Sequence, residues 1–269
     1  MNQAMELLNS PVQRYFMRLS YCGSFFQGWQ IQNQGRTVQG ELEKALALIT
    51  RQTIRIFGAG RTDTGVHAQQ MWIHFDALPL CGELENWVDK LNRVLPWDIV
   101  AYSLVKVPAT AHARFDAVSR TYHYHLSAQR SPFRHNLQTY IPYLPDFDAM
   151  NLAAQHLLGL HDFTTFSKTH TDVRTHNCNV HRAIWRPGEE PDEMVFEISA
   201  DRFLRNMVRA IVGQLLLVGR KKMTVTRFGE ILNARNRQLA TVTAPANGLF
   251  LHRINYPTAL EELLYPPLQ

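Results

Sequence analysis

The sequence has little of what marks secreted, membrane-spanning or disulfide-held proteins. It contains three cysteines among 269 residues, and no CxxC pair occurs. A disulfide framework is therefore not indicated, and a reducing compartment is expected. No apolar run approaches the roughly 18–20 residues of a membrane span. Residues 1–13 lack the basic and apolar regions of a signal peptide. These absences predict a cytoplasmic protein without membrane contact.

Lysine is also scarce. Only 6 of the 28 basic residues are lysines, which leaves 28 − 6 = 22 arginines and a net charge of +5. Arginine presents a planar fork that binds phosphate and stacks on bases. This balance is compatible with a nucleic-acid partner but does not require one. With 45% hydrophobic residues, the chain can bury the core of one large domain or two modest ones.

The periodicity of apolar residues predicts two similar halves. In the first, strands are expected at 15–21, 54–57, 71–75 and 99–107, with helices at 38–50, capped by Thr37, and at 84–95. In the second, strands are expected at 120–126, 183–185, 194–200 and 249–256, with helices from Asp148 to 160, at 203–219 and at 225–235. Each half follows a β-α-β-β-α-β order. The predicted fold is α+β, with two RRM-like or ferredoxin-like units, residues 14–110 and 111–258, whose antiparallel sheets join beside a basic active-site cleft.

The segment 58–67, GAGRTDTGVH, places Asp63 in a glycine-flanked turn between two predicted strands. Such an aspartate either forms an Asx-turn or is a positioned catalytic group. A P-loop is excluded because Val66 stands where the phosphate-binding lysine is required. A dinucleotide-binding loop is excluded because Asp63 replaces the third glycine. An aspartic protease needs a second DTG or DSG, which the chain lacks, and Arg61 would favour ionised carboxylates over a shared proton.

A series of further motifs accompanies this turn in a fixed order along residues 15–256, and the whole set resembles the TruA family of tRNA pseudouridine synthases. The segments that carry the resemblance are YCGSFFQGWQ (21–30), TVQ (37–39), GRTDTGVHA (60–68), HF (74–75), LPWDI (95–99), HARF (112–115), RTYHY (120–124), DF (162–163), FLRNMVR (203–209) and APANGL (244–249). Two departures are Cys22, where the family usually has a polar residue such as aspartate, and the bulky strand around Trp72.

The resemblance implies that Asp63 is the nucleophile of an isomerase that converts uridine to pseudouridine at tRNA positions 38, 39 and 40. The base is detached from ribose, turned and rejoined through C5. Attack on C1′, attack on C6 and a glycal route all stay open, and no cofactor is expected. Arg209 is the implied ionic partner of Asp63. Tyr122 is expected to pack on the flipped uracil and to serve in proton transfer. A helix-surface role for Arg209 and a strand-core role for Tyr122 are the alternatives.

The same resemblance implies substrate contacts around these residues. Arg61 is expected to fill the gap left by the flipped nucleotide or to hold the RNA backbone, and His67 to hold the turn or contact RNA. Arg114 and Arg205 are expected at phosphates, as are Arg120 and Arg202. The partners implied are tRNA and a second copy of the chain in a homodimer. Trp72 and residues 215–217 are expected as exposed apolar surface for that contact.

Two other interpretations are considered. A non-catalytic RNA-binding protein with two RRM-like units would bind tRNA without forming product, but the chain lacks the RNP1 aromatic pattern. The second interpretation concerns His170, His176, Cys178 and His181, which lie close together in sequence. Their spacing fits no standard zinc site, so an irregular solvated loop over 169–179 is expected.

Overall fold

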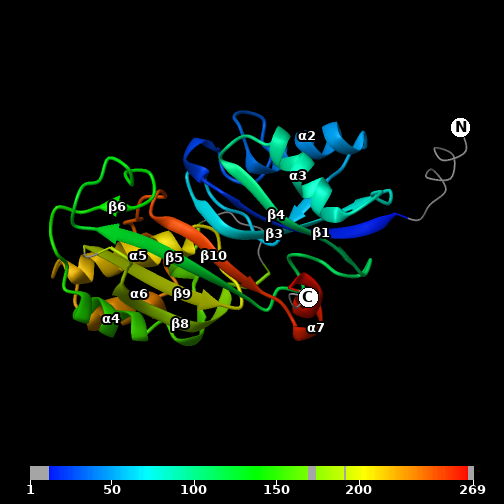
Figure 1. The fold of residues 1–269 in the computed structure, drawn as a ribbon. Helices are drawn as coiled ribbons and strands as arrows, with labels where there is room; N and C mark the ends of the chain where they lie inside the picture. Colours follow the sequence, from blue (N-terminus) through cyan, green and yellow to red (C-terminus); the bar gives the residue numbers. More distant parts are fainter. Residues whose placement is uncertain (1–11, 169–173, 191, 266–269) are drawn as a thin grey trace, which may run out of the picture. The chain divides into compact units, whose positions relative to one another are not determined.

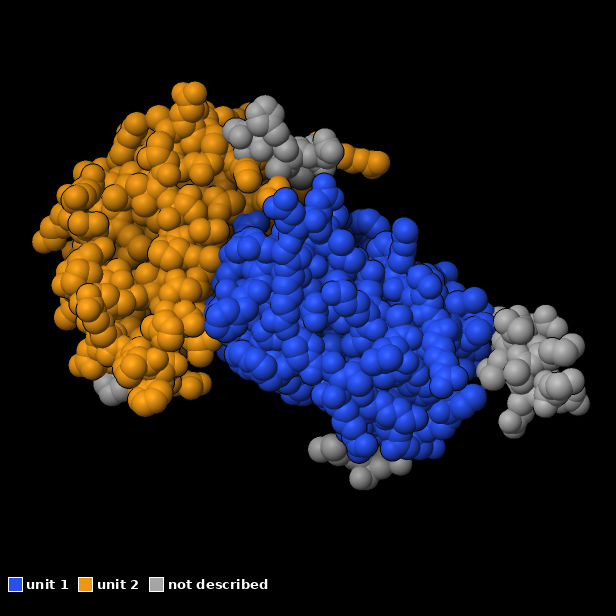
Figure 2. All heavy atoms as spheres, turned by 90° about the horizontal axis from the view of Figure 1, so that it is seen from above, with its two compact units in different colours: residues 1–118, 253–269 blue, residues 119–252 orange. Residues whose placement is uncertain are grey.

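The computed structural model describes residues 12–168, 174–190 and 192–265, and it combines helices with β-sheet (Figure 1). The chain divides into two compact units (Figure 2). Unit 1 comprises residues 1–118 and 253–269, and unit 2 comprises residues 119–252. None of the helices in the described ranges is long and apolar enough to cross a lipid bilayer.

Unit 1 contains the elements predicted for the first half, in the predicted order. They are β1 (Gln13–Tyr21), α2 (Val38–Thr50), β2 (Ile56–Gly58), β3 (His67–Ala77), α3 (Leu84–Val94) and β4 (Ile99–Val107). The antiparallel strands lie in the order β4-β1-β3, and β2 pairs with the outer part of β3. Thr37 caps α2 as predicted, because its side chain accepts a hydrogen bond from the Gly40 backbone N–H at 3.3 Å.

The core of unit 1 corrects one expectation. Trp72 on β3 is fully buried, with its ring edge-on to those of Tyr256 and Tyr265. Tyr265 follows the short helix α7 (Thr258–Leu264), which the sequence pattern did not predict. Leu215 in unit 2 is also fully buried. The expectation that these two residues form exposed apolar surface is therefore wrong, because each lies inside the core of its own unit.

Unit 2 is built on an antiparallel set of strands. Along the sheet they run β5 (Ser119–Ser127), β9 (Glu193–Ala200), β8 (Asn177–Pro187) and β7 (Gly159–Asp162). On its other side β5 is followed by β10 (Leu249–Asn255), and the short β6 (Thr139–Tyr140) pairs with β5 in parallel. Three helices complete the unit: α4 (Phe147–Gln155), α5 (Met207–Gly219) and α6 (Val225–Asn233). Helix α4 contacts α5, α6 and β8.

Two helix boundaries differ from the predictions. Helix α4 is capped by Asp146, whose carboxylate accepts from the Ala149 N–H at 3.0 Å, and not by Asp148. The helix ends at Gln155, and residues 159–162 form strand β7 instead of a last helical turn. Helix α5 begins at Met207 rather than at 203, because Asn206 has a φ of 65° in the left-handed region, which a right-handed helix does not accept.

The segment around Cys178 is more regular than predicted. Strand β8 begins at Asn177, and Cys178 is fully buried within it. Burial raises the pKa of this thiol to about 12, so it stays protonated and is unsuited to bind a metal as thiolate. His170 lies outside the described residues. Among the residues that are described, no three His, Cys, Asp or Glu side chains gather as a possible metal site.

Candidate active site

Asp63 lies in a tight turn between β2 and β3 of unit 1. Its backbone carbonyl accepts a hydrogen bond from the Val66 N–H at 3.1 Å, which closes the turn. Gly65 has a φ of 77°, a conformation that glycine adopts without strain. The Asp63 side chain is half-buried. The carboxylate is therefore held on a closed turn and keeps some access to solvent.

A second segment holds this turn from the side. The Trp29 N–H donates to the Thr62 carbonyl at 3.0 Å, and the Tyr21 and Thr62 hydroxyls are 2.8 Å apart. Gly28 lies so close that a Cβ on it would be 2.7 Å from the Thr62 carbonyl oxygen. The motif at 21–30 is thus a clamp on the backbone at Thr62 and Asp63, a role that the spacing of the two motifs in the sequence did not reveal.

His67 is part of the same clamp. It is 1% exposed, and its Nδ1 accepts a hydrogen bond from the Gly23 N–H at 3.0 Å. A Cβ on Gly23 would be only 2.0 Å from the Val66 carbonyl oxygen, so only glycine allows this approach. Because Nδ1 is an acceptor, it carries no proton in this arrangement. The geometry places His67 as a support that joins the start of β3 to residue 23.

An ion pair missed by the sequence analysis fixes the far side of the clamp. The guanidinium of Arg36 donates to both carboxylate oxygens of Asp98, at 2.7 and 2.9 Å. These hydrogen bonds raise the pKa of Arg36. Asp98 is 4% exposed, and its backbone carbonyl accepts from the Cys22 N–H at 2.9 Å. A buried carboxylate close to a distant arginine is not visible as a spacing in sequence, because 62 residues separate them.

Tyr122 and Arg209 lie in unit 2. Tyr122 is on β5 opposite Ile198, is half-buried, and packs edge-on against Phe203 with 5.0 Å between ring centroids. Arg209 is in the first turn of α5. Its Nε donates to the Ala244 carbonyl at 2.8 Å, and the Ala244 N–H donates back to the Arg209 carbonyl at 3.0 Å. Two hydrogen bonds to one residue fix both the backbone and the guanidinium of this half-buried arginine.

The loop that holds Arg209 is itself anchored. Tyr124 donates from its hydroxyl to the Pro245 carbonyl at 3.1 Å and lies 2.6 Å from the Thr139 hydroxyl. Burial raises the pKa of Tyr124, so this hydroxyl stays protonated. The Asn247 amide donates to the carbonyls of His135 and Gln138, at 3.0 and 2.8 Å. These contacts explain the APANG motif as the structural support of Arg209.

The remaining predicted substrate contacts are spread over both units. Arg61 and Arg114 are exposed in unit 1, and the Arg114 guanidinium carbon lies 5.7 Å from the centre of the Phe115 ring. Arg205 is exposed in unit 2, just before α5, where its carbonyl accepts from the Lys168 N–H at 3.1 Å. Arg61, Asp63 and His67 thus share one turn, while Tyr122, Arg205 and Arg209 belong to the other unit.

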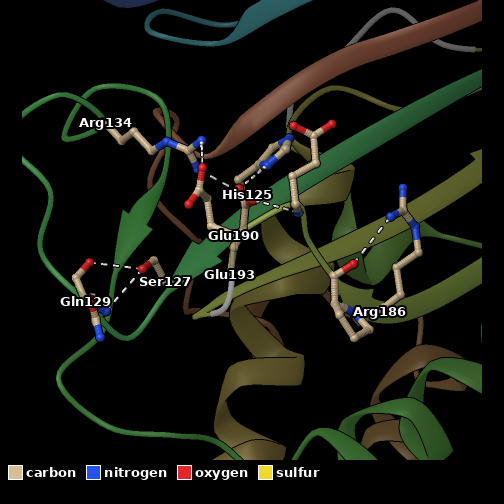
Figure 3. Close-up of polar contacts among 9 residues, drawn as sticks. His125, Ser127, Gln129, Arg134, Arg186, Glu190 and Glu193 are labelled. Carbon is tan, nitrogen blue, oxygen red and sulfur yellow. Dashed lines mark hydrogen bonds and ion pairs between the residues drawn. The ribbon is translucent and has the colours of Figure 1, made fainter.

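A second polar cluster in unit 2 has a structural character. Figure 3 shows His125 beside Glu193, with Nδ1 2.7 Å from Oε1, and Arg134 bonded to Glu190 at 2.7 Å. Burial raises the pKa of Glu193, but the hydrogen bond from His125 and the charge of Arg134 outweigh it and leave that pKa below its usual value. The neighbouring His123 is stacked on His252, with 3.7 Å between ring centroids. Burial, together with the proximity of His252, lowers the pKa of His123 to about 4.

Comparison with known proteins agrees with the motif pattern. The sequence model of a family described as tRNA pseudouridine synthase matches residues 153–257. A protein named tRNA pseudouridine synthase A from Parabacteroides distasonis is 50% identical over 93% of this chain and 98% of its own length. Proteins of the same name from Porphyromonas gingivalis and Bacteroides fragilis are each 47% identical, over 92% and 93% of this chain and 98% and 99% of their own lengths. The chain therefore belongs to the tRNA pseudouridine synthase A family of pseudouridine-forming isomerases.

Proposed function

We propose that this chain isomerises uridine to pseudouridine in the anticodon arm of tRNA, at positions 38, 39 and 40, with Asp63 as the nucleophile. The observation that carries the proposal is the clamped turn. Two glycines approach its backbone more closely than any other residue could, and a half-buried carboxylate is presented on it. Rigid placement of a reacting group contributes to catalysis because the entropy of orientation is lost before the reaction begins.

The reaction needs a nucleophile but no redox or phosphoryl step. The bond between ribose C1′ and uracil N1 breaks, the base turns, and a new bond forms between C1′ and C5, with loss of the C5 proton. An ionised carboxylate attacks C1′ or C6, or assists a glycal route. A base inside the anticodon arm must first leave its stack, at a cost of a few kcal/mol. The exposed Arg61, two residues before Asp63, is proposed to occupy the gap.

Tyr122 and Arg209 are proposed to act on the same nucleotide. The hydrogen bond from Nε to Ala244 orients the Arg209 guanidinium, whose terminal nitrogens are suited to pair with a carboxylate. Tyr122 is proposed to pack on the uracil and to take part in proton transfer at C5. Arg114 and Arg205 are proposed at phosphates. His67 is proposed to act mainly by holding the turn, since it is buried.

The broader organisation follows the family resemblance. We propose that residues 14–110 and 111–258 are RRM-like units, each of β-α-β-β-α-β type, with the catalytic aspartate on the first and the tyrosine and arginine on the second. We also propose that the enzyme works as a homodimer in the cytoplasm without a cofactor. The homodimer is checked by sedimentation or light scattering at micromolar concentration.

The decisive experiment compares the wild-type protein with Asp63→Asn on unmodified tRNA, with pseudouridine mapped by position. We expect product at 38, 39 and 40 from the wild type, and a rate lowered by more than about 10³-fold in the variant. Asp89→Asn, a change at an exposed acid of α3, is the matched control and should leave the rate unchanged. A fully active Asp63→Asn protein would refute the role of Asp63. Product outside the anticodon arm would refute the substrate positions, and tRNA binding without product in the wild type would favour the non-catalytic alternative.

A further inference from the structure

Two large aromatic side chains of unit 1 are exposed side by side. Phe25 is 60% exposed and Trp97 is 77% exposed. Their ring centroids are 6.2 Å apart at an interplanar angle of 67°, an edge-to-face arrangement. An exposed tryptophan is uncommon on a folded protein, because burial of its surface is strongly favourable. The pair lies 72 residues apart in sequence, since 97 − 25 = 72, so the fold has brought it together.

Phe25 is tied to the Asp63 turn. It ends the short 3-10 helix η1 (Gly23–Phe25), and the first residue of that helix donates to His67 at 3.0 Å. The residue after it, Phe26, accepts a hydrogen bond at its carbonyl from the Gly65 N–H at 3.4 Å. Phe25 therefore projects from a segment whose two ends both contact the turn that carries the candidate nucleophile.

Trp97 is fixed to the same segment from the other side. The next residue, Asp98, accepts from the Cys22 N–H at 2.9 Å and binds the Arg36 guanidinium with both carboxylate oxygens. The Ile99 N–H donates to the Pro96 carbonyl at 3.0 Å, which closes a turn around Trp97. The backbone on both sides of Trp97 is thus held, and the ring is presented on a rigid support.

We propose that Phe25 and Trp97 form a stacking platform for one nucleobase of the tRNA beside the target uridine. The inference rests on the proposed function and extends it by naming a further RNA contact. Aromatic rings bind bases of any identity because every base has a π-face. A platform fixed to the catalytic turn would hold the RNA in register with Asp63 while the target nucleotide is out of its stack.

The surroundings favour RNA over a protein partner. Phe25 is followed by the exposed Gln27 and Gln30, which break the apolar surface. A stable protein interface needs about 800 Å² on each partner, far more than two rings supply, whereas one base needs only a ring face. The exposed Arg61 on the adjoining turn adds positive charge for the phosphate backbone.

Trp97 supplies its own reporter. Trp29, Trp72 and Trp185 are buried, so stacking of a base should quench mainly the emission of Trp97. We would titrate the Asp63→Asn protein with an anticodon stem-loop RNA, with and without Trp97→Phe. We expect quenching in the protein that retains Trp97, and its loss in Trp97→Phe while RNA affinity, measured by filter binding, stays close to that of the parent. An unchanged Trp97 emission at saturating RNA would overturn the proposal.

Activity gives the second measurement. Phe25→Ala and Trp97→Ala should each weaken RNA binding and raise KM about tenfold or more, with a smaller change in kcat. Phe133→Ala removes another exposed ring, 91% accessible, in unit 2 and should change neither. Circular dichroism checks that each variant is folded. Wild-type KM in both folded alanine variants would refute the platform even when the wild type forms pseudouridine. A wild type that binds the stem-loop and quenches but forms no product would instead refute the proposed function alone.

Discussion

The clamp on the Asp63 turn leads to a prediction about Gly28. Its φ is 85°, and a Cβ on it would be 2.7 Å from the Thr62 carbonyl oxygen and 3.2 Å from the Asp63 carbonyl carbon. The left-handed conformation costs a non-glycine residue about 1–2 kcal/mol. Forcing an extra methyl group against packed atoms costs about 1–3 kcal/mol more. The Gly28→Ala variant should therefore lose roughly 2–5 kcal/mol of unfolding free energy.

The contacts at Gly28 are backbone atoms, so relief requires that the turn itself moves. A displacement of about 1 Å at a reacting group can lower a rate by about 10²-fold. We expect Gly28→Ala to form pseudouridine at least about tenfold more slowly under single-turnover conditions, at a temperature where the variant is folded. Urea unfolding followed by fluorescence gives the stability change, and tRNA binding by filter assay should be affected much less than the rate.

Gly60 provides the matched control. It belongs to the same motif, but a Cβ on it would meet no atom within 4 Å, and its φ is not positive. Gly60→Ala should leave the unfolding free energy unchanged or raise it by about 0.4–1 kcal/mol, because the unfolded chain loses freedom. Equal stability of Gly28→Ala and Gly60→Ala would show that the close approach at Gly28 does not constrain the turn, and the reasoning would fail.

Two further predictions concern unit 2. Arg209→Lys keeps the charge but loses the Nε hydrogen bond to Ala244; kcat should fall by about tenfold or more with little change in tRNA affinity, and an unchanged kcat would contradict an orienting role for that bond. His123 has a pKa lowered to about 4, against 6.5 when unfolded, so its contribution is complete above pH 6.5 and is lost as the pH falls toward 4, because the unfolded chain binds the proton first. Urea unfolding at several pH values should show a shallower loss over this window in His123→Gln, whereas an identical slope would disprove the assignment.

Local features of the fold were predictable from the sequence. The cap at Thr37, the bounds of α2 and β4, and the order of elements in unit 1 follow from side-chain hydrogen bonding and apolar periodicity within short windows. The errors fell where a local signal had a competitor. Asp146 and Asp148 are both suitable caps, and the apolar run at 203–206 resembles a helix until the left-handed Asn206 interrupts it.

Motif order identified the family, and the same motifs drew attention to Asp63, Tyr122 and Arg209. What the sequence by itself determined was therefore the chemistry of the residues present and the periodicity of the elements that carry them. Only the tertiary structure decided that Gly23 and Gly28 clamp the Asp63 turn, that Arg36 binds Asp98, and that Phe25 lies beside Trp97. The physical reason is that these contacts join residues 35–72 positions apart, and such pairs are set by strand register and packing, which no short window of sequence encodes.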